Sequence, residues 1–291
     1  MAMTKSFLFV GGDLRSLYAA KKLNHNYKVK AFGFSDTQLD MNFDIFDKYD
    51  SIKDEKYDYI VLPLPASTDE KHINSPYYEE KIPFEIIFDY IKDKGTVFVG
   101  RRWSALENMC REREIELIDY FTREELVVMN ALITAEGAVE IALQNSGKTL
   151  FGSNVLITGC GRITKSLLRL LSGFGANITV TARKFEDLSW ARIMGANAFH
   201  INDTAKKLSS FDIVFNTVPA AIFSEEALGE FKRDCLFIDL ASKSGIDDLE
   251  LARKMGLNVI WALSLPGKSA PITAGEIIAD TIENILSERS G

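Results

Sequence analysis

The chain has 291 residues, of which 46% are hydrophobic and 26% charged, and its formal net charge is -7 at pH 7. This length suits two α/β domains, and an acidic chain without a Lys/Arg-rich run argues against a nucleic-acid partner. No apolar run approaches the length of a membrane span, and residues 1–6 do not resemble a signal peptide. We therefore expect a cytoplasmic protein with no membrane partner.

The cysteines and histidines argue against a disulfide framework and a metal site. Cys110, Cys160 and Cys235 are odd in number and scattered, and the three histidines also lie far apart in the sequence. Disulfide-rich domains and zinc sites need closely and regularly spaced ligands, so we expect reduced thiols and no bound metal.

The first half of the chain predicts a parallel α/β domain, which we place at residues 1–125. Short apolar runs predict strands, and stretches with helical spacing separate them. The strands are expected at 6–10, 28–34, 58–62, 96–99 and 115–118, and the helices around 14–23, over 84–91 and over 103–113. Gly11-Gly12-Asp13 makes a glycine turn after the first strand, and a Pro-rich loop containing Ser67 follows the third.

Residues 126–150 are expected to join two α/β blocks and to lie along the cleft between them. A helix is predicted at 138–144, preceded by Thr134 and Glu136. Thr134 and Glu136 should then be at or near the ligand. A second interpretation of Glu136 stays open, in which it is a first-turn charge that the helix dipole favours.

Residues 154–184 carry the most informative motif. An apolar run at 155–158 predicts a buried strand, followed by a glycine turn, a helix from 162 and a second strand at 177–181. This order is typical of a dinucleotide-binding unit, in which amides at the helix start hold a pyrophosphate; the alternative is an empty turn of the same type. Thr164 replaces the third glycine of the motif and should displace or repack the helix. The expected cofactor contacts are Gly159, Cys160, Gly161, Arg162, Ile163 and Thr164.

The end of the second strand of this unit indicates which nucleotide binds. An NAD site places Asp or Glu about 20 residues after the turn, where it accepts from the ribose 2′-OH. Here Arg183 and Lys184 occupy the strand end, and no carboxylate occurs before Glu186. A 2′-phosphate is a dianion that the two cations would pair with, so NADP is favoured over NAD. A solvated basic pair is the alternative.

Three further strands, expected at 212–215, 236–239 and 258–261, complete a second domain at residues 151–268. The loops after them leave carboxyl ends of parallel strands, where cofactor and substrate should meet. The residues expected at the cofactor there are Asn216, Thr217, Val218, Pro219, Leu240 and Ala241. Residues 269–291 predict a terminal helix, over 271–286, that returns to the first domain. The expected fold class is α/β, with two Rossmann-like parallel-sheet domains joined by hinge helices.

These motifs together resemble the A-subunit family of dipicolinate synthase from spore-forming bacteria. The resemblance runs from residue 11 to residue 275. Its cues are Gly11-Gly12-Asp13, Asn130 with Thr134-Ala135-Glu136-Gly137, Gly159-x-Gly161-Arg162, Asn216-Thr217-x-Pro219, Asp239-Leu240-Ala241-Ser242-Lys243 and the stretch from Leu265-Pro266-Gly267 to Ala274-Gly275. The Thr-Ala-Glu-Gly segment also resembles S-adenosylhomocysteine hydrolase and the D-2-hydroxyacid dehydrogenases. The chain departs from the family pattern at Thr164, Ile133, Arg101-Arg102 and Lys268-Ser269.

The resemblance implies a nicotinamide-dependent oxidation of dihydrodipicolinate to dipicolinate, in the mother cell during sporulation. It implies a small dicarboxylate substrate and, as partner, the B-subunit of the synthase, which looks like a flavoprotein; a homo-oligomer is a further option. Two alternatives stay open: a binding subunit whose partner does the redox step, and another two-domain hydroxy- or amino-acid dehydrogenase. The latter would lack an evident His or Asp base.

A substrate with two carboxylates needs cations or N–H and O–H donors in its site. Arg101, Arg102 and Lys268 are the cations nearest the predicted strand ends. Ser67, Thr134 and Ser242 are candidate donors of hydrogen bonds to the substrate. Glu136 is the candidate acceptor of the ring proton, with a cap as its alternative role.

Overall fold

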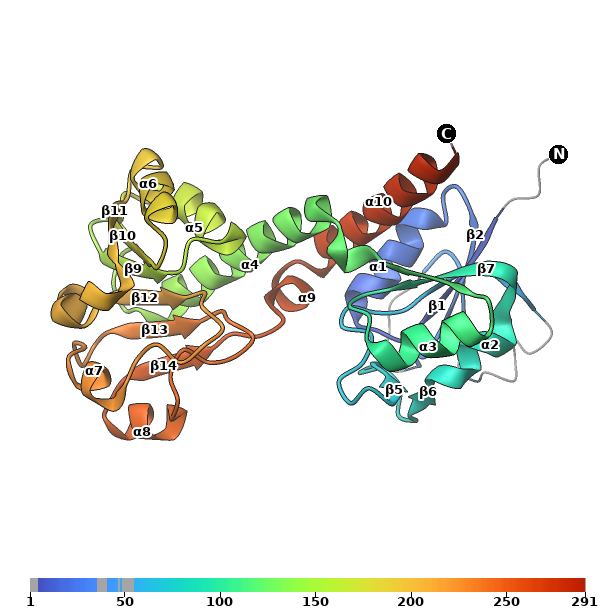
Figure 1. Ribbon diagram of the computed structural model, residues 1–291, viewed down its shortest axis with the longest axis horizontal. Helices are drawn as coiled ribbons and strands as arrows, with labels where there is room; N and C mark the ends of the chain where they lie inside the picture. The colour runs from blue at the N-terminus through green and yellow to red at the C-terminus, as the bar shows by residue number, and fades with distance from the viewer. Residues whose placement is uncertain (1–4, 36–40, 47, 49–54, 291) are drawn as a thin grey trace. The chain divides into compact units, whose positions relative to one another are not determined.

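The computed structural model describes residues 5–35, 41–46, 48 and 55–290, which form two compact units (Figure 1). The first unit contains Met1–Met129 and Pro271–Gly291, and the second contains Asn130–Ala270. Among the described residues, each unit is built on a parallel six-stranded sheet whose strands follow the order 3-2-1-4-5-6 of dinucleotide-binding folds. The expected fold class, two Rossmann-like parallel-sheet domains, is confirmed.

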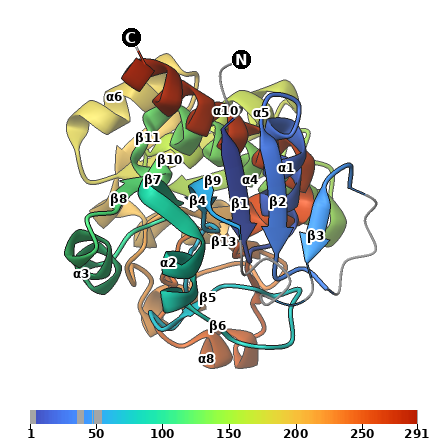
Figure 2. The same cartoon turned by 90° about the vertical axis from the view of Figure 1, so that its right-hand side faces the viewer.

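The sheet of the first unit has β1 at its centre, with β2 and β4 on either side of it (Figure 2). All five side chains of β1 are buried, because helices cover both faces of such a sheet. In spatial order the strands are β3 (Asp44–Phe46), β2 (Lys28–Phe32), β1 (Ser6–Val10), β4 (Tyr57–Val61), β7 (Ile91–Val99) and β8 (Glu116–Asp119).

The helices of the first unit include the end of the chain. Helix α10 packs against α1, and its Ile278, Ile282 and Ile285 join Leu17 in one apolar core. Gly275 lets the two helices approach, since a Cβ there would lie 2.5 Å from the Arg15 carbonyl oxygen. The elements are α1 (Leu14–Leu23), the hairpin β5 (His72–Ile73) and β6 (Ile82–Pro83), the 3₁₀ helix η2 (Phe84–Ile86), α2 (Ile87–Tyr90), α3 (Ser104–Glu112), η3 (Tyr120–Thr122) and α10 (Pro271–Ser290).

The sheet of the second unit has the same order of strands. Helices α5 and α6 follow its first and second strands, and apolar cores lie on both faces. The strands are β11 (Asn197–His200), β10 (Asn177–Ala182), β9 (Asn154–Thr158), β12 (Ile213–Asn216), β13 (Leu236–Asp239) and β14 (Asn258–Trp261). The helices are α5 (Arg162–Gly173), α6 (Phe185–Ile193), η4 (Ile201–Asp203), η5 (Ala205–Ser210), α7 (Glu225–Gly229), α8 (Leu249–Lys254) and α9 (Leu265–Ser269).

Helix α4 (Glu124–Asn145) is much longer than the helix predicted at 138–144. Gly137 lies in its interior and is closely packed, since a Cβ there would lie 2.4 Å from Ser269 Oγ. Ala135, Ala138 and Ala142 of the same helix are fully buried in the core of the second unit. The helix therefore continues through the glycine because tertiary packing outweighs its low helix propensity.

Helix α4 also corrects the expectation that no apolar run is long enough to cross a membrane. It has 22 residues and a mean hydropathy of 1.7 over its most apolar window, which satisfies the length and composition of a span. Half of that window is buried inside the protein. A buried core helix meets the same criterion, so length and composition alone do not make this helix a span.

Two shorter elements also differ from the sequence predictions. The helix expected over 84–91 consists of η2 and α2, and Ile91 already begins β7. The strand starts early because Ile91 pairs with Tyr57 of β4, ahead of an irregularity that shifts the register. Residues 265–267, expected in a loop, begin helix α9.

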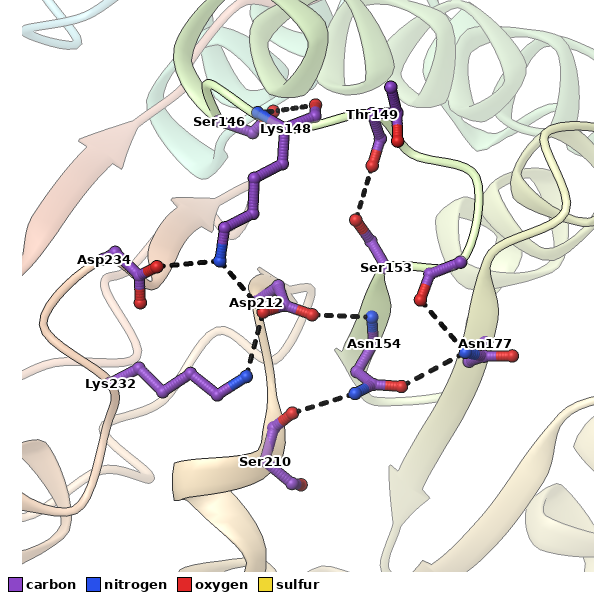
Figure 3. A network of polar contacts seen from close by, with 11 residues as sticks. Ser146, Lys148, Thr149, Ser153, Asn154, Asn177, Ser210, Asp212, Lys232 and Asp234 are labelled. Atoms are coloured by element: carbon purple, nitrogen blue, oxygen red, sulfur yellow. Dashed lines mark hydrogen bonds and ion pairs between the residues drawn. The ribbon is translucent and has the colours of Figure 1, made fainter.

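The amino-terminal edge of the second sheet is held by a partly buried carboxylate (Figure 3). Asp212, just before β12, accepts the backbone N–H of Asn154 at 2.9 Å and hydrogen bonds from Lys232 at 2.9 Å and Lys148 at 3.3 Å. Burial alone would raise the pKa of Asp212, but these donors bring it below its ordinary value. Asp212 thus ties the start of β9 to the start of β12.

The first sheet has a corresponding carboxylate. Asp58 of β4 accepts the backbone N–H of Ser6 at 3.0 Å, and Lys92 and Lys5 donate to it at 2.9 Å and 3.2 Å. Although burial opposes the shift, hydrogen bonds from Lys92, Ser6 and Lys5 hold the pKa of Asp58 well below its usual range. The amino-terminal edges of the two sheets are therefore stabilised alike.

Candidate functional site

The glycine turn between β9 and α5 combines a backbone that only glycine can adopt with an uncapped helix start. Gly159 has φ +88°, and a Cβ there would lie 2.6 Å from Thr217 Oγ1, so only glycine fits. Gly161 is the N-cap residue of α5 and has no side chain that could cap the helix. A Cβ added at Gly161 would meet no atom within 4 Å. The start of this helix is thus open on the side of Gly161, and helix N-termini attract anions.

Thr164 repacks the turn rather than opening it. Its side chain is fully buried, and its hydroxyl donates to the Gly159 carbonyl oxygen at 3.1 Å. The same hydroxyl lies 3.2 Å from Thr217 Oγ1, which donates to the Thr158 carbonyl oxygen at 2.7 Å. The residue that departs from the glycine motif therefore links the glycine turn to the loop after β12.

A buried polar network fixes the loops at the carboxyl-terminal edge of the second sheet. Asn216 Oδ1 accepts from Thr158 Oγ1 at 2.6 Å, and Asn216 Nδ2 donates to Asp239 Oδ1 at 2.8 Å. Asp239 also accepts the backbone N–H groups of Ala241 at 3.1 Å and Gly245 at 2.7 Å. Asn216 and Asp239 are fully buried, so they position backbone rather than touch a ligand directly.

The remaining predicted cofactor residues of this region lie around the same edge. The Val218 amide donates to Asn216 Oδ1, the Leu240 amide donates to the Asn216 carbonyl oxygen, and Pro219 is exposed. Cys160 points its thiol at the carbonyl oxygen of Asp187, 3.4 Å away, and burial raises the pKa of that thiol. The structure thus brings most of the predicted cofactor contacts together at the carboxyl ends of β9, β12 and β13; their contact with a nucleotide stays a prediction.

A cavity of about 360 Å³ lies beside the end of β10, and Arg183 lines it together with Asn202, Thr204, Phe223 and Ser224. Thr204 is 5% exposed, and its hydroxyl has no hydrogen-bond partner in the described part of the chain. A buried hydroxyl without a partner is costly and often marks a ligand position. Sequence patterns did not point to Thr204 or Ser224, because neither β11, which precedes Thr204, nor α7, which Ser224 caps, was predicted.

Arg183 and Lys184 differ in their surroundings. Lys184 Nζ lies 3.2 Å from Glu186 Oε1, so its charge is already paired. Arg183 is exposed, and its guanidinium makes no hydrogen bond or ion pair with any residue that the structure describes. Its backbone carbonyl oxygen accepts from His200 Nε2 at 3.0 Å. Of the predicted pair, Arg183 is therefore the better candidate for a phosphate contact.

Three of the six predicted substrate residues are already engaged in the fold. Ser67 Oγ donates to the His72 carbonyl oxygen at 2.7 Å, and Thr134 Oγ1 donates to the Asn130 carbonyl oxygen at 2.8 Å. Arg102 forms an ion pair with Glu107 at 3.0 Å.

Arg101, Ser242 and Lys268 are the other three. Arg101, Ser242 and Lys268 are all exposed, and within the described ranges of the chain their side chains have no partner. Arg101 lies in the first unit, and Ser242 and Lys268 lie in the second. All six assignments remain predictions.

Glu136 does not lie in the first turn of a helix, as one interpretation had it. Helix α4 begins at Glu124, so Glu136 is an exposed residue of its interior. Interaction with the positive end of the helix dipole is confined to the first turn and cannot explain this carboxylate. Its role as a proton acceptor stays a prediction. Within the residues that the structure covers, no group of His, Cys, Asp or Glu has the arrangement of a metal site.

Both units match families of known proteins. Residues 6–121 match the family model for the N-terminal domain of the dipicolinate synthase A-subunit. Residues 117–263 match the model described as D-isomer specific 2-hydroxyacid dehydrogenase, NAD binding domain. Over 283 residues the chain is 31% identical to the dipicolinate synthase A-subunit of Bacillus subtilis (strain 168), covering 96% of this chain and 95% of that protein.

Solved structures agree with the sequence comparison. The dipicolinate synthase A-subunit from Bacillus halodurans superposes with a TM-score of 0.86 at 29% identity, covering 97% of each chain. Transhydrogenase from Sinorhizobium meliloti has a TM-score of 0.71 at 15% identity, covering 97% of this chain and 94% of that one. At that identity the second likeness shows the fold alone.

The open glycine turn and the family models define a class: a two-unit α/β protein whose second unit is an NAD(P)-binding domain of the dehydrogenase type. Within that class, the chain belongs to the A-subunit family of dipicolinate synthase. The resemblance drawn from the sequence motifs is thereby confirmed.

Proposed function

We propose that this chain oxidises dihydrodipicolinate to dipicolinate with NADP as the hydride acceptor, in the mother-cell cytoplasm of a sporulating bacterium. The observation that carries the proposal is the uncapped N-terminus of α5 at Gly161, which leaves room and backbone amides for a diphosphate. Membership of the A-subunit family of dipicolinate synthase supports the substrate.

The choice of NADP rests on the cavity beside β10. A 2′-phosphate needs a cation and hydroxyl or amide donors, and the cavity offers Arg183, Thr204, Ser224 and Asn202. Thr204 would satisfy its buried hydroxyl on such a ligand. NAD has no phosphate at this position and would leave Arg183 without a counter-charge.

The reaction removes one hydride and one proton from a dihydropyridine ring and leaves an aromatic pyridine. The nicotinamide nucleotide accepts the hydride when it is bound, and the protein's task is to position the two rings. Glu136 is the proposed acceptor of the proton, since its carboxylate is exposed. Replacing Glu136 by Gln should lower turnover by roughly 10²- to 10⁴-fold if the carboxylate is the base.

A flavoprotein-like second subunit is the proposed partner, since the relatives of this chain are named as one subunit of the synthase. Two divisions of labour are compatible with that partner. In the favoured one this chain carries out the oxidation, and in the other it binds nucleotide or substrate while the partner transfers the electrons.

The decisive experiment uses the purified chain alone with freshly prepared dihydrodipicolinate and either NADP or NAD, followed by absorbance of the reduced nucleotide. We expect NADPH to form without a partner. Nucleotide binding without turnover until the flavoprotein-like partner is added would support the binding-subunit alternative. No binding of any nicotinamide nucleotide to folded protein would refute the proposal.

Arg183→Ala tests the nucleotide preference. We expect the KM for NADP to rise about 10-fold or more with little change for NAD, since a charge-assisted hydrogen bond contributes about 1.5–3 kcal/mol. Lys184→Ala is the matched control and should change the preference little, because Lys184 is paired with Glu186. An unchanged preference in Arg183→Ala would remove the role given to Arg183.

A further inference from the structure

The loop after β7 holds a non-glycine residue in the left-handed region. Arg101 has φ +72°, a conformation that costs free energy for any residue with a Cβ. The loop leaves the carboxyl-terminal end of β7, the edge at which sheets of this kind bind ligands. Four other described non-glycine residues, Glu70, Lys94, Glu114 and Ser264, also have positive φ, so it is the position of Arg101 at this edge, together with its strain, that points to a role in binding.

A single carboxylate holds the strained loop in place. Asp119, at the end of the neighbouring strand β8, accepts the backbone N–H of Arg101 at 3.2 Å and that of Arg102 at 3.0 Å. It also accepts the N–H of Phe121 at 2.9 Å. The oxygens of Asp119 thereby bind backbone amides and not the arginine side chains.

Close packing supports the loop from the other side. A Cβ on Gly100 would lie 2.5 Å from the Pro63 carbonyl oxygen and 2.7 Å from Leu64 Cα, so the backbone of the loop lies directly against the loop after β4. The path of the chain before Arg101 is therefore fixed on both sides.

The guanidinium groups of the two adjacent arginines differ in their ion-pair partners. Arg102 Nε lies 3.0 Å from Glu107 Oε1. Arg101 is exposed, and its guanidinium has neither an ion pair nor a hydrogen bond to the residues described in the structure. The fold thus keeps the Arg101 guanidinium at the strand edge with no counter-ion among the described residues, on a backbone held in a costly conformation.

We propose that Arg101 binds one carboxylate of the pyridine dicarboxylate and that Asp119 is the positioning residue that presents it. This inference rests on the proposed function. A guanidinium is planar and matches a carboxylate through two parallel hydrogen bonds, so a fixed backbone orientation favours this recognition over a flexible lysine. Arg101 then distinguishes a substrate with two carboxylates from one with a single carboxylate.

The test compares binding of pyridine-2,6-dicarboxylate and pyridine-2-carboxylate by calorimetry, with NADP present. The wild type should prefer the dicarboxylate by about 10-fold or more. Arg101→Gly should bind the two ligands equally, with the affinity for the monocarboxylate unchanged. Glycine also relieves the strain, so the same variant should melt about 1–3 °C higher. A gain in stability together with a loss of dicarboxylate binding excludes misfolding as the cause.

Asp119→Asn tests the positioning role, because an amide oxygen can replace only part of the carboxylate's hydrogen bonding. Dicarboxylate affinity should fall about 3- to 10-fold. In the Arg101→Gly background the same change should cause no further loss, whereas a merely structural role would add to the first effect. Arg111→Ala, which removes an exposed arginine of α3, is the charge control and should bind as the wild type does.

Three results would overturn the inference: wild-type selectivity in Arg101→Gly, a loss of selectivity in Arg102→Ala instead, or additive losses in the double variant. Failure of the proposed function would give a different result. Wild-type protein that binds NADP but neither pyridine ligand would refute the proposed substrate, and with it the role given to Arg101.

Discussion

Both units contain the same order of strand, glycine turn and helix, but the helix that follows the turn is capped by a side chain in only one of them. Gly11-Gly12-Asp13 follows β1 in the first unit, and Gly159-Cys160-Gly161 follows β9 in the second. Both sheets have the same strand order, and both turns precede a helix of ten residues or more. The difference lies in the residue at the N-cap of each helix.

In the first unit the protein's own carboxylate occupies the helix N-terminus. Asp13 Oδ1 accepts the backbone N–H of Arg15 at 3.0 Å, and its carboxylate also pairs with the Arg15 guanidinium at 2.8 Å. Arg15 is buried and donates to the Leu64 carbonyl oxygen. A diphosphate at this turn would meet a like charge and a capped helix.

In the second unit the N-cap is Gly161, which carries no side chain and leaves the helix start open. The same order of strand, glycine turn and helix can therefore carry either a capped or an uncapped helix start. The N-cap residue decides whether the positive end of the helix is available to a ligand.

The largest effect is expected from making the second turn like the first. Gly161→Asp places a carboxylate at the N-cap of α5, and two like charges a few ångströms apart repel by about 4 kcal/mol near a protein surface. We expect NADP affinity, measured by calorimetry, to fall roughly 100- to 1000-fold. The melting temperature should stay the same or rise slightly, because Asp is a better N-cap than glycine.

Gly161→Asn is the matched control for this change. It caps the helix and has nearly the same size, but it adds no charge, so its loss of affinity should be distinctly smaller. Wild-type affinity in Gly161→Asp would show that the nucleotide does not bind at this turn.

The second prediction concerns the turn of the first unit, where Asp13 caps helix α1. Asp13→Asn keeps the cap but removes the partner of the buried Arg15 guanidinium, whose side chain is 8% exposed. We expect the first unit to lose about 2 kcal/mol of unfolding free energy, less than for a fully buried pair because Asp13 is partly exposed. Urea denaturation should show the loss, and calorimetry should show unchanged NADP affinity.

Asp248→Asn is the control that measures the effect of replacing a capping aspartate. Asp248 caps α8 by accepting the Leu251 N–H at 2.9 Å. Its replacement should change stability by no more than about 0.5 kcal/mol, since asparagine caps equally well. Equal losses of stability in the two variants would contradict the importance of the Asp13–Arg15 ion pair. Weaker NADP binding in Asp13→Asn would contradict the assignment of the nucleotide to the turn at Gly161 alone.

The smallest effect is expected at the amino-terminal edges, where the two units are alike. Asp212→Asn should cost about 1–2 kcal/mol at neutral pH, because it leaves Lys232 and Lys148 without their shared carboxylate. The folded-state pKa of Asp212 lies below its unfolded value, so its stabilisation is complete above about pH 4 and is lost as the pH falls further. Denaturation at about pH 7, about pH 5 and about pH 3 should show the difference from wild type shrinking only at the lowest pH.

Asp234→Asn provides the comparison for an exposed carboxylate. Asp234 pairs with Lys148 at 2.7 Å but is largely exposed, so its removal should destabilise less than that of Asp212. A pH-independent difference for Asp212→Asn would show that its charge does not contribute to stability.

Much of the second unit was predictable from local patterns. The buried run at 155–158, the turn at Gly159 and Gly161, and the strand beginning at Asn177 were placed correctly. Such signals are local, because a buried parallel strand needs a short apolar run and a positive φ needs glycine. The family resemblance also depended on local motifs, and it was confirmed.

The errors occurred where distant residues decide the structure. Helix α4 was predicted only over 138–144, because the packing of Gly137 against Ser269 and of the buried alanines is invisible in the sequence. Thr204 was overlooked because only the folded chain reveals that its hydroxyl is buried beside Arg183. The phosphate contact predicted for Lys184 stays a prediction, with Glu186 as a competing partner for its charge.

By itself the sequence determined two α/β units, the glycine turn that suits a nucleotide, and the family, because each depends on the order of residues along the chain. The folded structure was needed to show that Asp13 caps its helix while Gly161 leaves the other open, and that Arg102 is paired with Glu107 while the Arg101 side chain has no partner among the described residues. The physical reason is that hydrogen bonds and ion pairs satisfy a charged group through space, so its availability to a ligand depends on how side chains are oriented in the fold, even when their residues are close in the sequence.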